Sequence, residues 1–162
     1  MCAFCLCHCL RAGDNAQCGT YIARASHMVD ELAPLLLGSR CKDGTVEWKV
    51  VGEESTLTTA QVLTQNLHES HELAITGDPT MHALEADGTM AQLLMSIRIF
   101  ARMTPDGKVR VIKLLQAIAS CSVNYNYLQE WCLIQGQGLA VGMTGDGGND
   151  CGALRVMLIS QA

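Results

Sequence analysis

The stretch GMTGDGGNDCGAL, residues 142–154, places two aspartates four residues apart in a glycine-rich turn. Carboxylate oxygens are ligands that Mg²⁺ prefers, and Mg²⁺ usually takes only one or two of them, with phosphate and water completing its shell. Asp146 is the first candidate ligand, and Asn149 and Asp150 would orient the metal, the phosphate or a water beside it. The intervening glycines would let the backbone approach a phosphate closely. By spacing alone, a magnesium site and an ordinary acidic turn fit this stretch equally well.

A calcium loop of the EF-hand type does not fit the same turn. Such a loop needs acidic or amide residues at alternate positions, then a glycine and a later glutamate. Gly148 and Cys151 interrupt that pattern, and no glutamate follows them. The calcium-loop alternative is therefore rejected for this turn.

Lys108 follows the segment ARMTPD and falls in the first turn of a predicted helix. In that place it would lie beside the same edge of the sheet as the acidic turn, and its ammonium group would neutralise a phosphoryl group or an aspartate there. The alternative is a lysine that is solvated at the surface.

Other metal-ligating residues give weaker patterns. Residues 1–9, MCAFCLCHC, crowd four cysteines and a histidine together. A zinc site usually takes two well-spaced ligand pairs, and no second CxxC follows here. The alternatives are a cysteine-rich buried strand or residues foreign to the native sequence. His68 and His71 are spaced to share a helix face, either as metal ligands or as ordinary surface residues.

Composition limits the class of protein. The chain has 162 residues, 49% of them hydrophobic and 17% charged, with a net charge of -5, which is typical of one globular domain. The absence of a basic stripe argues against nucleic acid and anionic membranes as partners. No apolar run reaches the roughly 20 residues of a membrane span, and the first residues are a poor signal peptide. The nine cysteines are therefore expected to stay reduced.

The elements that must position these residues follow a repeating pattern. Short apolar runs end in Gly-Asp turns at 13–14, 77–78 and 145–146. Helical spacing follows the first turn, where Asn15 is a suitable cap and apolar residues recur at Cys18, Ile22, Ala25, Val29 and Leu32. Strands that alternate with amphipathic helices predict an α/β domain with a mostly parallel sheet. Ligands bind such sheets at the carboxyl ends of the strands, so these turns should line one edge.

Further predictions concern the remaining segments. The run IRIFARM predicts a strand to Met103, after which Thr104 can cap a helix that begins at Pro105. Its buried face is expected at Val111, Leu114, Leu115 and Ile118. Alternation of Val46, Trp48 and Val50 predicts a half-exposed strand or hairpin arm. Residues 117–138 show no clear period, and we interpret them as an insertion.

Several of these segments together resemble one family. ARMTPDGK and GMTGDGGNDCGALR, preceded by AGDNAQCGTYIARASHMV (residues 12–29) and SHELAITGDPTMHALE (residues 70–85), resemble the phosphorylation domain of P-type ATPases in the order of that family. These ATPases are a branch of the haloacid dehalogenase-like superfamily. NDCGAL resembles the class V pumps, and within them the branch associated with lysosomal or vacuolar membranes and polyamine export. The resemblance implies a Rossmannoid three-layer domain that is incomplete in this chain.

The resemblance also implies roles for individual residues. Mg²⁺ would be bound by Asp146 and supported by Asp150, while Asn149 would support the phosphate and Lys108 would contact the phosphorylated aspartate or its phosphoryl group. Gly13 and Asp14 would lie near the phosphates and ribose of ATP. The partners would be ATP and the remaining domains of the pump, and the parent would be an integral protein of lysosomal, vacuolar or other endomembranes, with this domain on the cytosolic side.

Departures from the family pattern are equally specific. The chain lacks the DKTGT motif, whose aspartate is phosphorylated, and Ala12 stands where a phosphoryl-binding threonine is expected. KDGT at 42–45 is not a substitute, because no apolar strand is expected before it. The nucleotide-binding domain, the actuator domain and the membrane helices are absent too. We therefore predict that residues 1–162 are a single partial phosphorylation domain, either a fragment or an imperfect gene model with retained intron sequence, and that the chain alone is inactive.

Two alternatives remain open. One is a non-catalytic module of the same superfamily that binds Mg²⁺ and phosphate. The other is a small soluble phosphatase, which would need an aspartate at the end of a hydrophobic first strand. Asp14 and Asp78 are the candidates for that aspartate.

Overall fold

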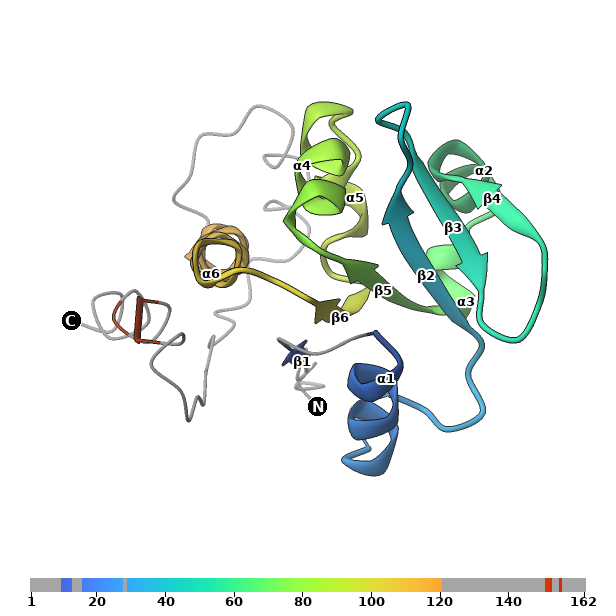
Figure 1. Ribbon diagram of the computed structural model, residues 1–162, viewed down its shortest axis with the longest axis horizontal. Coiled ribbons are helices and arrows are strands. Elements are labelled where there is room, and N and C mark those ends of the chain that lie inside the picture. Colours follow the sequence, from blue (N-terminus) through green and yellow to red (C-terminus); the bar gives the residue numbers. More distant parts are fainter. Residues whose placement is uncertain (1–9, 13–15, 28, 121–150, 153–154, 156–162) are drawn as a thin grey trace. The chain divides into compact units, whose positions relative to one another are not determined.

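The computed structural model describes residues 10–12, 16–27, 29–120, 151–152 and 155. The chain divides into two compact units, residues 1–103 and residues 104–162. The first unit contains a mixed β-sheet with helices (Figure 1). The second contains the long helix α6, Pro105–Ser120.

Six strands form the sheet in the order β1-β6-β5-β2-β3-β4. The four strands from β1 to β2 in this order are parallel neighbours, whereas β3 and β4 are added antiparallel. The predicted α/β class with a mostly parallel sheet is therefore confirmed. The strands are β1 (Leu10–Ala12), β2 (Leu35–Arg40), β3 (Val46–Val50), β4 (Thr56–Thr58), β5 (Glu72–Thr76) and β6 (Ile97–Ala101).

Helices of the first unit cover both faces of the sheet. Figure 1 shows α1 on one side of the strands and α4 and α5 on the other. Ala74, Ile99 and Ala101 pack with α1, while neighbouring residues of the same strands point to the opposite face because side chains alternate along a strand. The helices are α1 (Ala16–Ala25), α2 (Thr59–Thr64), α3 (Leu67–Ser70), α4 (Asp78–Ala86) and α5 (Met90–Leu93).

Helix α1 corrects one prediction from periodicity. It ends at Ala25 rather than continuing to Leu32, and it packs through the small residues Ala16, Gly19 and Ala23. Of the predicted apolar series, Ile22 is 45% exposed and Leu32, beyond the helix, is 93% exposed. Small side chains let the helix backbone approach the sheet closely, so the larger residues of α1 face solvent.

The β2–β3 hairpin confirms the strand predicted from the alternation of Val46, Trp48 and Val50. Trp48 is fully buried, and its ring lies over Gly38 of β2. A Cβ atom at position 38 would come within 3.0 Å of the ring. A side chain at position 38 would therefore force the ring of Trp48 to shift, because the backbone of β2 itself forms the surface on which the indole packs.

The boundaries of two predicted segments change. β6 ends at Ala101, two residues before the predicted end at Met103. Helix α6 begins at Pro105, as predicted, and continues to Ser120. The first four residues of the segment that we interpret as an insertion, 117–120, are thus helical, and residues 121–138 lie outside the described part of the chain.

Candidate functional site

The carboxyl ends of the parallel strands meet at one edge of the sheet. Ala12 of β1 and Thr76 of β5 both lie opposite Ala101 of β6, so three strand ends are in register. The backbone N–H of Gly77 donates to the carbonyl of Ala101 at 2.8 Å, which joins β5 and β6 beyond their last paired residues. The predicted position of the turn at 77–78 is confirmed.

Gly77 and Thr80 shape this edge. Gly77 has a φ of 76°, a conformation that glycine adopts without strain, and it turns the chain directly from β5 into α4. The hydroxyl of Thr80 donates to the carbonyl of Thr76 at 2.6 Å and accepts from the backbone N–H of Arg40 at 3.1 Å. One buried side chain thereby links the carboxyl ends of β5 and β2.

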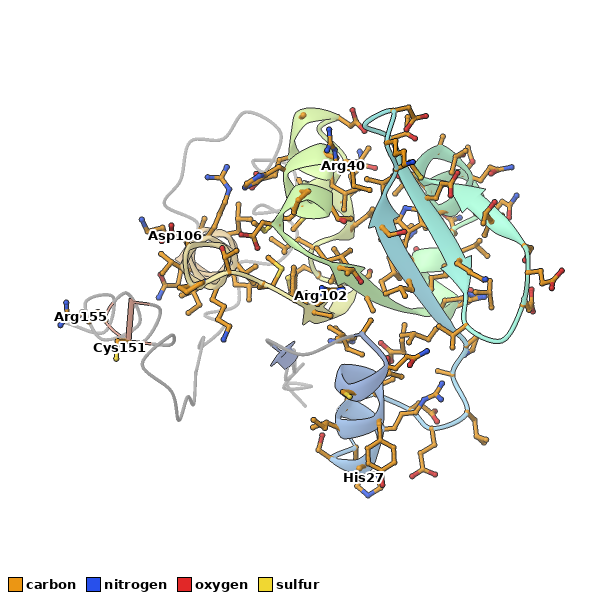
Figure 2. All side chains as sticks on the ribbon, in the orientation of Figure 1. His27, Arg40, Arg102, Asp106, Cys151 and Arg155 are labelled. Atoms are coloured by element: carbon orange, nitrogen blue, oxygen red, sulfur yellow. The ribbon has the colours of Figure 1, made fainter. Side chains whose placement is uncertain are left out.

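Two polar residues of this edge were not singled out by sequence reasoning. The Oγ1 atom of Thr76 is buried and has no hydrogen-bond partner in the described part of the chain. Arg102, labelled in Figure 2, directly follows β6 with a φ of 54°, an uncommon conformation for a residue other than glycine. A threonine or a charged residue directly after an apolar run is the only signal that could have identified them.

Lys108 lies in the first turn of α6 and is only 8% exposed. The turn is fixed by Thr104, whose hydroxyl accepts from the backbone N–H of Gly107 at 3.1 Å and whose carbonyl accepts from that of Lys108 at 2.9 Å. The predicted cap is thus confirmed. The alternative of a solvated surface lysine is wrong, because the side chain is buried, and burying an ammonium group is costly unless acceptors or a negative charge compensate it.

A contact within the second unit brings residue 152 to the same turn of α6. A Cβ atom on Gly152 would lie 3.4 Å from Cγ2 of Val109, the residue next to Lys108. Gly152 follows Asp150 by two residues in the chain. The segment directly after the GDGGND turn therefore packs against the first turns of α6.

Asp43 of the KDGT segment needs a correction. An apolar strand, β2, does precede this segment, contrary to the reason given for excluding it. The structure supplies a different reason: the carboxylate of Asp43 closes the β2–β3 turn by accepting from the backbone N–H of Thr45 at 3.0 Å and from its hydroxyl at 2.7 Å. These hydrogen bonds lower the pKa of the Asp43 carboxyl. Asp43 is thus part of an exposed turn.

Other predicted site residues lie outside the described part of the chain. They are Gly13, Asp14, Asp146, Asn149 and Asp150, together with the cysteines of residues 1–9. Among the residues that the structure describes, no three histidine, cysteine or carboxylate side chains converge as they would on a metal ion. His68 belongs to α3 and His71 is the extended residue that follows it, so the two do not share one helix face as predicted.

Comparison with known proteins identifies similar chains. The chain is 26% identical over 143 residues to a probable manganese-transporting ATPase of Arabidopsis thaliana, covering 88% of this chain and 10% of that protein. It is 26% identical over 161 residues to the probable cation-transporting ATPase 13A4 of mouse and of human, covering 89% of this chain and 12% of each. No profile of a known protein family matches it.

These similarities are distant but extend over most of the chain, and they support its resemblance to P-type cation-transporting ATPases. The chain spans about a tenth of the length of these relatives. No helix in the described ranges is long and apolar enough to cross a membrane.

Proposed function

We propose that this chain is part of the phosphorylation domain of a class V P-type ATPase, a pump that couples ATP hydrolysis to the transport of a cation or polyamine across an endomembrane. The observation that carries the proposal is the buried Lys108 at the start of α6, with Gly152 packed one residue away at Val109. The motif order and the similarity to cation-transporting ATPases support it.

Lys108 would act electrostatically. A cation held in a capped helical turn and shielded from water can stabilise the negative charge of a phosphoryl group more strongly than a solvated one. Because the turn is already ordered by Thr104, little reorganisation would be needed when the phosphoryl group arrives. We infer that Lys108 contacts this group or the phosphorylated aspartate.

The GDGGND turn would supply the acidic side of the same site. Asp146, with support from Asp150, would hold Mg²⁺, and Asn149 would support the phosphate. Mg²⁺, when bound, would neutralise charge on the phosphoryl oxygens. Gly152 against Val109 supports this arrangement, because it keeps the residues that follow the turn beside the helix that carries Lys108. Gly13 and Asp14, directly after β1, would lie near the phosphates and ribose of ATP.

The remaining domains of the pump would supply what this chain lacks. The aspartate of DKTGT is absent from the sequence, so this chain has no group to accept the γ-phosphate at the family's position. β1 is the last strand on one side of the described sheet. In the parent protein, the strand that carries the nucleophile would pair there.

A second candidate function is binding of Mg²⁺ and phosphate without catalysis. The missing nucleophile favours it for the chain as it stands. We expect both candidates to bind inorganic phosphate in the presence of Mg²⁺, whereas ATP turnover would require the nucleophile.

Calorimetric titration of the full chain with inorganic phosphate, with and without Mg²⁺, tests the site. We expect weak binding that needs Mg²⁺ and is lost in Lys108→Met and Asp146→Asn. Lys113→Met is the matched control, because Lys113 lies on the same helix but is exposed. Binding that survives Lys108→Met, or that Lys113→Met weakens equally, would contradict the assigned role of Lys108.

A further inference from the structure

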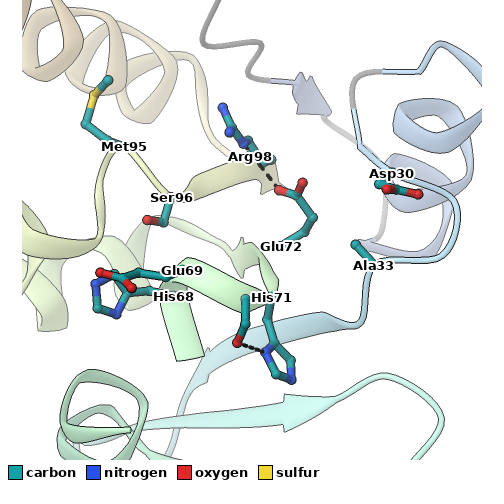
Figure 3. A pocket seen from close by; sticks show the side chains of 10 residues that line it. Asp30, Ala33, His68, Glu69, His71, Glu72, Met95, Ser96 and Arg98 are labelled. Atoms are coloured by element: carbon teal, nitrogen blue, oxygen red, sulfur yellow. Dashed lines mark hydrogen bonds and ion pairs between the residues drawn. The ribbon is translucent and has the colours of Figure 1, made fainter. Parts of the chain in front are cut away.

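We draw no further inference here: the strongest candidate, the polar cavity of about 290 Å³ at the amino ends of the parallel strands (Figure 3), is lined by a cluster of carboxylates and imidazoles in which Asp30 and Glu69 are exposed to solvent, and nothing in the structure shows what would bind there.

Discussion

At the scale of the residue, Asp43 shows how local hydrogen bonds decide the role of a carboxylate. Its oxygens are held by the backbone and hydroxyl of Thr45, and the hydroxyl is the main cause of its lowered pKa. Because the folded pKa lies below the ordinary value of 3.8, the ionised group stabilises the turn above that pH. This contribution is lost as the pH falls through the lower, folded pKa.

The variant Thr45→Val tests this explanation. It removes the hydroxyl while keeping the shape of the side chain, so we expect the pKa of Asp43 to rise toward its ordinary value. Thr45→Ser retains the donor and should retain the lowered pKa. Carboxyl-carbon NMR titration measures both. A pKa that does not change in Thr45→Val would show that the hydroxyl bond is not the cause.

The same scale explains why Lys108 and Lys113 differ. They lie on one helix, yet Lys108 is buried in the first turn and Lys113 is exposed. Residue type alone cannot distinguish a solvated lysine from one that is held in a shielded turn. Position relative to the Thr104 cap provides the distinction.

At the scale of the element, α6 depends on its cap. Thr104→Ala removes the hydroxyl that accepts from Gly107 and should cost about 1 kcal/mol of helix stability. We expect faster hydrogen exchange at the amides of the first turn, which includes Lys108. Thr104→Ser keeps the acceptor and is the control. Equal exchange rates in the alanine and serine variants would mean that the cap contributes nothing.

The β2–β3 hairpin depends on Gly38. Gly38→Ala places a methyl carbon 3.0 Å from the nearest ring carbon of Trp48, closer than an ordinary contact, and overpacking of this kind typically costs about 1–3 kcal/mol. Urea unfolding should show a lower midpoint with an unchanged slope. Ser39→Ala, an exposed position in the same strand, is the control. A midpoint unchanged in Gly38→Ala would indicate that Trp48 can move aside without loss of packing.

At the scale of the whole molecule, the missing nucleophile predicts an inactive chain. We expect no ATP hydrolysis by the purified chain above that of Asp146→Asn, because the aspartate of DKTGT is absent. Release of phosphate from ATP measures this directly. Turnover that Asp146→Asn abolishes would show that another residue accepts the phosphoryl group, and Asp78, which begins α4 at the carboxyl edge, would be examined first.

The sequence by itself determined the features that depend on residues close together in the chain. Apolar runs that end in Gly-Asp, and Thr104 followed by Pro105, predicted the turn after β5 and the start of α6, because caps, glycine turns and strand alternation depend on neighbours in the chain. The same local rules predicted β3 from Val46, Trp48 and Val50. The motifs likewise indicated a P-type ATPase, which the distant similarities support.

Tertiary structure decided what depends on neighbours far apart in the sequence. Periodicity could not show that α1 would pack through its alanines and glycine, since that choice depends on how closely the helix approaches the sheet. Nor could it show that Lys108 is buried or that Gly152 lies against Val109. A polar cavity at the amino ends of the parallel strands is lined by Asp30, Glu69 and Arg98, which are distant in sequence, and the order of the strands brings them together. The sequence therefore specified the chemistry of single motifs. Packing decided which side chains are buried and which charged side chains, distant in sequence, lie close together.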